Sequence, residues 1–247
     1  EAETEFTVAV AIDPNLVRAY VGRARTRLAL GREEEGRADA RHAIELCSAA
    51  VAANPADAEA WFLRGLARRV IGEEADASWD LTRALELRPD FPEARLERAH
   101  IYRRQGRLDL AIEHCTRALE VRPDYVSAWL TRARAYYQSE KYDAALADCS
   151  SAIEVNPECA RAHFNRGLVQ YRKQDLAAAL ADFTRALELQ ADYADAYVYR
   201  GEVYQALGDL AAARRDWEQT LALKSTGWAA DLAREGLKQL GEQGREQ

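Results

Sequence analysis

The sequence predicts an all-α protein built from repeated pairs of amphipathic helices. The first observation is a regular spacing of prolines, because four of the six stand 34 residues apart in this 247-residue chain. These are Pro55, Pro89, Pro123 and Pro157. The second is the composition, which is dominated by the good helix formers Ala, Leu, Arg and Glu. The third is that small residues recur at fixed places between the prolines, as they do where two helices cross closely.

The prolines divide the chain into repeats, and we start each repeat three residues after the proline position. Full repeats then cover residues 17–57, 58–91, 92–125, 126–159, 160–193 and 194–227. Residues 1–16 fit the second half of an earlier repeat, residues 228–240 a capping helix with a polar outer face, and residues 241–247 a flexible tail. Because the sequence lacks Met and opens within a repeat, we expect further residues upstream.

The repeat at residues 17–57 is seven residues longer than the others. Seven residues are close to two helical turns, so the apolar face keeps its direction. We expect its second helix to run unbroken from about Arg37 to Ala53 and to project roughly 10 Å beyond its neighbours. A tolerated insertion and a contact ridge for a neighbouring domain are both compatible with this pattern.

The repeat pattern resembles the tetratricopeptide repeat (TPR) family, in which Trp-x2-Leu-Gly-x2-Tyr is followed by Ala-x3-Phe and Pro. The prolines and a few residues of several repeats carry the resemblance, which covers essentially the whole chain. These residues are Trp61, Gly65, Trp129, Tyr136, Ala179, Phe183, Tyr197, Gly201 and Tyr204. The resemblance implies a right-handed superhelical solenoid of antiparallel helix pairs, with a concave groove lined by the first helix of each pair.

One column departs from the family pattern, because the seventh residue of every full repeat is Arg instead of Leu. The six are Arg23, Arg64, Arg98, Arg132, Arg166 and Arg200. An acid follows sixteen residues later in five repeats: Asp39, Asp80, Asp148, Asp182 and Asp216. The exception is His114, which stands opposite Arg98. Since a guanidinium matches a carboxylate in a bidentate pair, we expect a ladder of partly buried ion pairs within the helix pairs.

The inner positions of the first helices supply the candidate binding site. They combine basic side chains with aromatic rings: Arg69, His100, Arg103, Arg104, Arg134, Tyr137, Arg161, Asn165, Tyr171 and Arg172. Acidic residues, among them Glu97 and Asp195, flank this stretch. Such a groove suits an extended or helical peptide with acidic and apolar residues, although an ordinary solvated Arg-rich face would share the composition. The family's carboxylate clamp and asparagine ladder both need further Asn residues beside Asn165, so we expect neither.

Trp79 stands apart from the repeat columns, because its equivalents in other repeats are polar or small. An exposed Trp is often a contact residue. The alternative, which the longer neighbouring helix favours, is that Trp79 packs beneath that helix.

Charge and composition exclude several classes of function. A net charge of −7 opposes nucleic-acid binding, and no apolar run approaches the roughly 18 residues that would span a membrane. The four cysteines form no CxxC pair and have no His at metal-ligand spacing, so we expect reduced core thiols, a cytoplasmic protein, and no metal or cofactor. No nucleophile–base constellation or phosphate-binding loop occurs, so we do not expect an enzyme.

These observations predict a protein–protein interaction scaffold that binds a peptide or a neighbouring domain in a basic, aromatic-containing groove, to which an acidic partner would be suited. The alternative is a structural spacer or self-assembly region of a larger signalling protein, such as a kinase, protease or secretion component. The excess of Arg over Lys is typical of a GC-rich bacterial genome, so we expect a bacterial origin. The sequence leaves the oligomeric state open.

Overall fold

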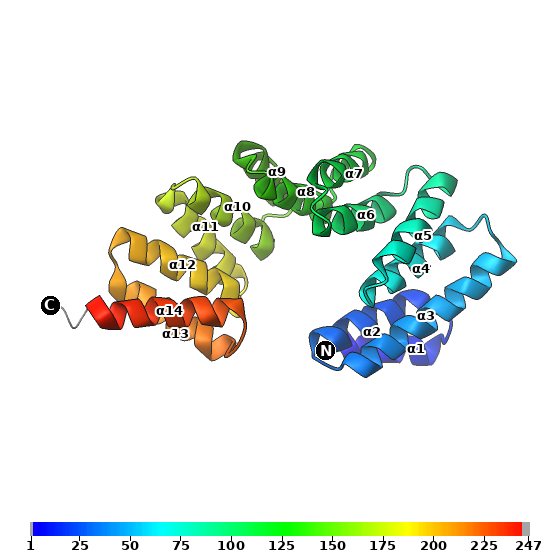
Figure 1. The fold of residues 1–247 in the computed structure, drawn as a ribbon, viewed down its shortest axis with the longest axis horizontal. Coiled ribbons are helices and arrows are strands. Elements are labelled where there is room, and N and C mark those ends of the chain that lie inside the picture. The colour runs from blue at the N-terminus through cyan, green and yellow to red at the C-terminus, as the bar shows by residue number, and fades with distance from the viewer. Residues whose placement is uncertain (1, 244–247) are drawn as a thin grey trace. The chain divides into compact units, whose positions relative to one another are not determined.

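The computed structural model describes residues 2–243, which form fourteen α-helices and no strand (Figure 1). Helices α1 to α7 belong to one compact unit, Glu1–Pro123, and α8 to α14 to a second, Asp124–Gln247. The first unit contains α1 (Ala2–Ile12), α2 (Val17–Ala29), α3 (Glu33–Ala53), α4 (Ala58–Val70), α5 (Glu74–Leu87), α6 (Pro92–Arg104) and α7 (Leu108–Val121). The second contains α8 (Val126–Gln138), α9 (Tyr142–Val155), α10 (Ala160–Arg172), α11 (Leu176–Leu189), α12 (Ala194–Leu207), α13 (Leu210–Leu223) and α14 (Trp228–Gln243).

Consecutive helices pack as pairs, and neighbouring pairs stack within each unit, so the predicted all-α solenoid of antiparallel helix pairs is confirmed. The first helices of the pairs, α2, α4, α6, α8, α10 and α12, begin at the residues where the proline spacing starts each repeat. The fifteenth residue of every repeat has a positive φ and closes the turn between the two helices. It is glycine in four repeats, but Glu140 (φ 58°) and Gln174 (φ 64°) take the same conformation in the second unit.

The core is made where small residues of the first helix meet larger residues of the second. A Cβ added at Gly167 would lie 2.9 Å from the Phe183 ring, so only glycine allows these two helices to approach so closely. The larger column is fully buried at Leu81, Cys115, Cys149, Phe183 and Trp217. Cys47 is also buried and Cys159 partly so, and all four cysteines carry free thiols.

The predicted ladder of ion pairs is confirmed at all five Arg–Asp positions. In the α8–α9 pair, the Nε and Nη2 groups of Arg132 each donate to a different carboxylate oxygen of Asp148 at 2.8 Å. Arg23 and Asp39, Arg64 and Asp80, Arg166 and Asp182, and Arg200 and Asp216 form the equivalent pairs. All five carboxylates are buried. Each pair ties the first helix of a repeat to the second.

The α6–α7 pair lacks this connection, because His114 replaces the acid. The Arg98 guanidinium instead donates to the hydroxyl group of Tyr102. The Nε of Arg98 and the Nδ1 of His114 are both buried without a hydrogen-bond partner. Burial, together with the positive charges of Arg98 and Arg95, lowers the pKa of His114 to about 4. His114 is therefore neutral at pH 7 and cannot neutralise Arg98.

Two helix boundaries differ from the sequence-based expectations. Helix α3 begins at Glu33, four residues before the expected start, because Glu33 to Glu35 favour a helix N-terminus. Helix α14 continues through Gln243, so the tail expected at 241–247 is helical at its start. The helix continues because no proline stops it after the buried Leu240. Residues 244–247 lie outside the described part.

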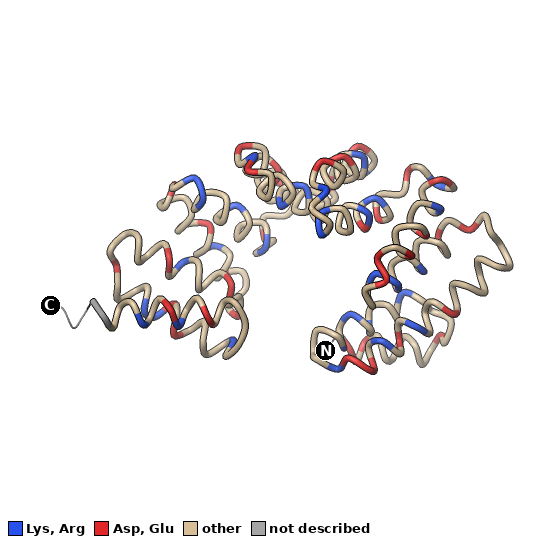
Figure 2. The backbone as a smooth tube through the Cα atoms, in the orientation of Figure 1, with Lys and Arg blue, Asp and Glu red and all other residues tan. Residues whose placement is uncertain are grey.

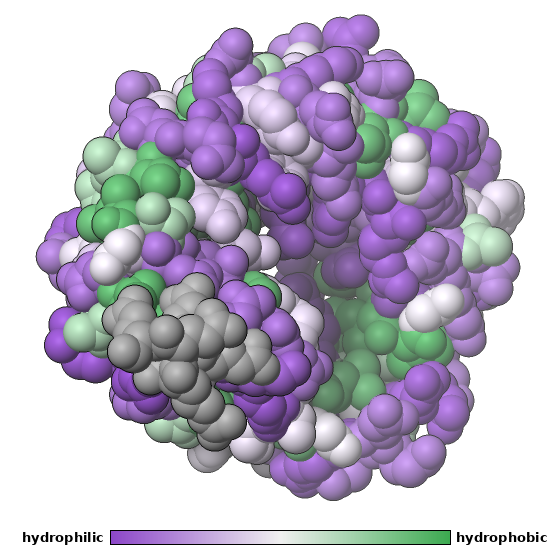
Figure 3. All heavy atoms as spheres, turned by 60° about the vertical axis from the view of Figure 1, so that its left-hand side comes forward, coloured by the Kyte–Doolittle hydropathy of each residue, from purple (hydrophilic) through white to green (hydrophobic). Residues whose placement is uncertain are grey.

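The expectation that Trp79 packs beneath the long helix is wrong. Its side chain is 54% exposed, and its ring meets the edge of Trp61 at 5.1 Å. Polar and charged side chains cover most of the face seen in Figure 3. Trp79 is one of two exposed tryptophans among the described residues, and Trp228 is the other.

Candidate functional site

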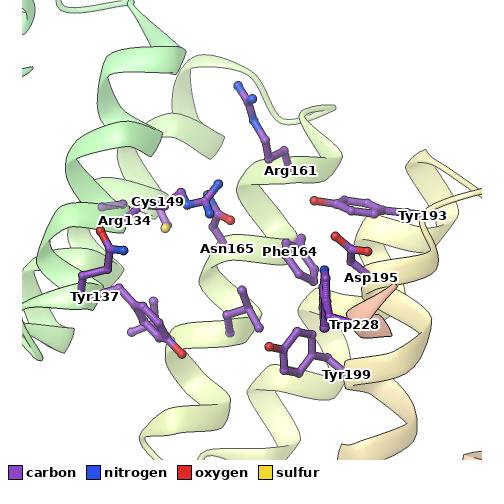
Figure 4. A pocket seen from close by; sticks show the side chains of 14 residues that line it. Arg134, Tyr137, Cys149, Arg161, Phe164, Asn165, Tyr193, Asp195, Tyr199 and Trp228 are labelled. Atoms are coloured by element: carbon purple, nitrogen blue, oxygen red, sulfur yellow. The ribbon is translucent and has the colours of Figure 1, made fainter. Parts of the chain in front are cut away.

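The second unit contains a pocket of about 370 Å³ among its first helices (Figure 4). Helices α8, α10 and α12 supply most of the lining, and Cys149 of α9 and Trp228 at the start of α14 complete it. The lining residues are Ala133, Arg134, Tyr137, Gln138, Cys149, Arg161, Phe164, Asn165, Leu168, Val169, Tyr193, Asp195, Tyr199 and Trp228. The size and the mixed lining are typical of a ligand-binding pocket.

Two arginines give the pocket a basic side. Arg134 of α8 and Arg161 of α10 are both exposed, and neither forms an ion pair or a hydrogen bond within residues 2–243. Most other arginines of the chain are paired with an acid, and Figure 2 shows acidic and basic residues interspersed along both units. The two unpaired guanidinium groups are therefore available to a carboxylate from outside.

Asn165 lies between the two arginines and the opposite wall of the pocket (Figure 4). It is only 7% exposed, and its Nδ2 is buried without a hydrogen-bond partner. Because an unpaired buried amide is unfavourable by about 1–3 kcal/mol, such a group is uncommon unless it serves a ligand or a bound water. A half-turn about the Cβ–Cγ bond exchanges Oδ1 and Nδ2, so the amide can offer either a donor or an acceptor.

The opposite wall is aromatic. The Phe164 ring lies 4.8 Å from Tyr193 and 5.9 Å from Tyr199, and the Trp228 ring lies 5.7 Å from Tyr199. Trp228 is 51% exposed and follows Gly227, whose φ of 92° turns the chain into α14. An exposed indole beside other rings offers apolar area at a low cost in conformational entropy.

The pocket places a carboxylate and a phenol between these two walls. Asp195 pairs with Lys224 at 3.0 Å. Burial and the charge of Asp195 raise the pKa of Tyr193 to about 12, while Arg161 and Arg134 oppose the increase. The hydroxyl group of Tyr193 is therefore a neutral donor near both arginines. At the other end, the Nε of Arg172 donates to the hydroxyl oxygen of Tyr137 at 2.8 Å, and this bond raises the pKa of Arg172.

Two ion pairs occupy part of the equivalent surface of the first unit. Arg18 of α2 pairs with Glu59 of α4, at the repeat positions that Arg161 and Asp195 occupy in the second unit. Asp195 is one methylene shorter than Glu59 and bonds only Lys224. A second pair, Arg69 with Glu97, occupies the repeat positions that correspond to Tyr137 and Asn165.

The first unit also covers its aromatic residues with its own charged groups. The Phe62 and Phe91 rings lie 4.7 Å apart, and the equivalent Phe164 and Tyr193 rings of the second unit lie 4.8 Å apart. The Arg88 guanidinium lies over the Phe91 ring and also pairs with Glu59. The two units thus share a framework, but the first covers part of this surface with ion pairs that the second lacks.

Family models for the tetratricopeptide repeat match residues 28–80, 130–194 and 174–231, and a second model for the same repeat matches residues 92–125. Together these matches span more than half of the chain. The chain belongs to the tetratricopeptide repeat family. No curated protein matches the chain. Membership of this family supports a role as a protein-interaction scaffold.

Solved structures with the same fold share little sequence with this TPR chain. YrrB, described as a TPR protein with an unusual peptide-binding site, is 20% identical with a TM-score of 0.61, over 78% of this chain and 97% of its own. A thermophilic TPR protein from Thermus thermophilus, TTC0263, is 23% identical with a TM-score of 0.61, over 74% and 98%. The Cut9–Hcn1 structure of the APC/C is 16% identical with a TM-score of 0.73, over 95% and 46%. At this identity the likeness shows the fold alone.

The ten residues expected to line the TPR groove divide between the two units. Arg134, Tyr137, Arg161 and Asn165 line the pocket, and Arg172 contacts Tyr137. The Tyr171 ring lies 6.2 Å from Tyr199. Asn165 is buried, because α8 and α12 flank α10 on both sides.

The other four expected groove residues lie in the first unit and interact within the protein. Arg69 pairs with Glu97, and Arg104 pairs with Glu74 at 2.9 Å. His100 and Arg103 also interact with neighbouring groups. These four side chains are therefore less available to a ligand than Arg134 and Arg161.

The sequence-based search missed the aromatic wall. The residues expected to line the groove did not include Phe164, Tyr193 or Trp228. One signal was available, because the last residue of three repeats is aromatic: Phe91, Tyr125 and Tyr193. No cluster of three or more potential metal ligands occurs among the described residues, and none of their helices is long and apolar enough to cross a membrane.

Proposed function

We propose that this TPR chain is an interaction module that binds a peptide segment of another protein in the pocket of its second unit. The observation that carries the proposal is the pair of unpaired guanidinium groups, Arg134 and Arg161, beside the unbonded amide of Asn165. Several other inner-face arginines, among them Arg18, Arg69 and Arg104, form ion pairs with the protein's own acids. Groups that the fold leaves unpaired are free to recognise a partner.

The ligand of this module carries at least one acidic group. The binding surface comprises Arg134, Tyr137, Arg161 and Asn165, together with Arg172, which contacts Tyr137, and Tyr171, which contacts Tyr199. A partner domain that presents such a segment on its surface would bind in the same way. No group of this surface is assigned a catalytic role.

Selection of peptides from a random phage-displayed library on the immobilised chain tests this proposal. The affinity of the recovered peptides is then measured by fluorescence anisotropy for the wild type and for R134E/R161E. We expect the double charge reversal to weaken binding at least tenfold, about 1.4 kcal/mol, because both side chains line the pocket.

The matched control is R214E/R215E, which makes the same change of net charge on α13. Arg214 and Arg215 are exposed and form no ion pair or hydrogen bond among the described residues, and they lie outside the pocket. Equal loss of binding in both double variants would show that net charge and not the pocket is responsible. Recovery of no peptide would favour a structural spacer or a self-assembly region.

A further inference from the structure

The geometry points to a specific ligand: an extended peptide in which an acidic side chain is followed directly by a large apolar or aromatic side chain. The acid would bind Arg134 and Arg161, the apolar side chain would pack on Phe164, Tyr199 and Trp228, and Asn165 would bond the main chain between them. This inference rests on the proposed function and names the chemistry of its ligand.

The charge of the pocket requires an acid from outside. In the first unit Glu59 reaches Arg18, whereas Asp195 at the equivalent position does not reach Arg161. In the first unit Glu97 occupies the position of Asn165 and neutralises Arg69. The second unit thus has an amide at the position of Glu97, and no acid among its described residues pairs with Arg161. A carboxylate held by two guanidinium groups forms charge-assisted bonds that a neutral side chain cannot replace.

The amide of Asn165 favours an extended chain over a helix. The pocket, of about 370 Å³, accepts two adjacent side chains of a ligand. A helix satisfies its own backbone groups, whereas an extended peptide leaves a carbonyl and an amide free to bond Asn165.

The position of the aromatic wall determines which kind of side chain should follow the acid in the ligand. Phe164, Tyr199 and Trp228 lie across the pocket from Arg134, with Asn165 between (Figure 4). Tyr199 stacks on Phe183 of the core at 6.0 Å, so this part of the wall is held by the fold. Trp228 is half exposed and would gain most from being covered. A large apolar side chain next to the acid would cover it.

Short synthetic peptides in a Gly/Ser frame test this inference by isothermal titration calorimetry against the intact chain. The central pair is Glu-Phe, and the comparison peptides carry Gln-Phe, Glu-Ala or Lys-Phe, all with amidated C-termini. We expect Glu-Phe to bind and each comparison peptide to bind at least tenfold more weakly. A further peptide that ends in a free carboxyl-terminal Phe tests whether the protein recognises a terminal carboxylate instead of an acidic side chain. Tighter binding of this peptide than of Glu-Phe would contradict the assignment.

Three variants locate the peptide on the protein. R134E/R161E should lose affinity for the Glu-Phe peptide and gain affinity for the Lys-Phe peptide. Asp195→Glu should weaken Glu-Phe by a factor of several, because the longer acid can reach Arg161 as Glu59 reaches Arg18. The double variant Tyr137→Arg, Asn165→Glu copies the Arg69–Glu97 pair of the first unit and should abolish binding.

A change at Asn165 separates recognition from folding. Asn165→Leu removes an unbonded buried amide, so it should raise the melting temperature while it weakens Glu-Phe binding. Lower stability of this variant would show that the amide serves the fold.

The outcomes distinguish this inference from the proposed function. If library-selected peptides bind in the pocket but show no acid–apolar pair, the inference is wrong and the proposed function stands. If no peptide of either kind binds up to about 1 mM, a free energy of about −4 kcal/mol, both are wrong.

Discussion

At the scale of single residues, the ion pair between Arg132 and Asp148 shows what the repeated Arg–Asp column does. Burial raises the pKa of Asp148, and the two hydrogen bonds from Arg132 oppose that increase. The carboxylate is therefore held in its charged form by its partner. Arg132 also lies over the Trp129 ring, with 4.8 Å between the guanidinium carbon and the ring centre. The pair thus joins α8 to α9 by charge, by geometry and by packing.

Breaking this pair from one side should destabilise the fold strongly, because the remaining charge stays buried. We expect Arg132→Ala to lower the free energy of unfolding by about 3 kcal/mol. Arg134→Ala, an exposed position on the same helix, should change it by no more than about 0.5 kcal/mol. Urea unfolding of both single variants and of the double variant with Asp148→Ala gives the coupling energy, which should be about 1 kcal/mol or more. Additive effects would contradict the pairing.

The missing pair at Arg98 and His114 predicts a dependence of stability on pH. In the unfolded chain His114 has a pKa of about 6.5, whereas burial lowers it to about 4 in the folded chain. Between these values the unfolded state binds more protons, so stability falls as the pH drops from about 6.5 to about 4. The contribution of neutral His114 to the free energy of unfolding is fully present above pH 6.5.

His114→Asp should remove this dependence and complete the sixth ion pair with Arg98. At pH 7 we expect the variant to be more stable than the wild type by about 1 kcal/mol, because the Nε of Arg98 gains a partner. Its advantage should grow at pH 5, where the wild type has lost stability. Urea unfolding at the two pH values checks both statements, and a variant less stable than the wild type at pH 7 would contradict them.

At the scale of helices, the last elements are joined through a buried indole. The Trp217 ring of α13 lies between Gly201 of α12 and Gly236 of α14 and is fully buried. A Cβ at either glycine would lie 2.6 Å from a ring atom. This contact fixes α14, and α14 in turn presents Trp228 to the pocket.

Gly236→Ala should therefore weaken the attachment of α14, although alanine is the better helix former by about 1 kcal/mol. Overpacking against the ring is unfavourable by about 1–3 kcal/mol, so we expect a net loss of stability and weaker peptide binding. The control is Gly241→Ala on the same helix, where an added Cβ meets nothing within 4 Å. That change should leave stability unchanged or raise it slightly. Thermal unfolding distinguishes the two variants, and equal effects on stability would contradict the role of the Trp217–Gly236 contact in holding α14.

Much of this architecture is predictable from the sequence, because a fixed period of 34 residues places every helix in one frame. The Arg–Asp column could be predicted for the same reason, since both residues recur in register. The end of α14 was less predictable, because neither a proline nor a repeat column marks it. The exposure of Trp79 was missed because it depends on the direction of α3 relative to α5, which the period does not specify.

At the scale of the whole molecule, two units built on one framework differ in what they leave uncovered. The sequence predicts which side chains lie on the inner face, but it does not predict which of them find partners. Arg69 is paired because Glu97 faces it, whereas Arg161 is unpaired because Asp195 is one methylene shorter than Glu59. Of the ten positions predicted to line the groove, four line a pocket of about 370 Å³ in the second unit.

The measurement that tests this account most directly is a crystal structure of the intact chain with a library-selected peptide bound. We predict density for an extended peptide in the pocket, with a carboxylate about 3 Å from the guanidinium groups of Arg134 and Arg161. A side chain of the same peptide should cover Trp228, and the amide of Asn165 should bond its main chain. Density for the peptide on the first unit, or on the second helices of the second unit, would contradict the account.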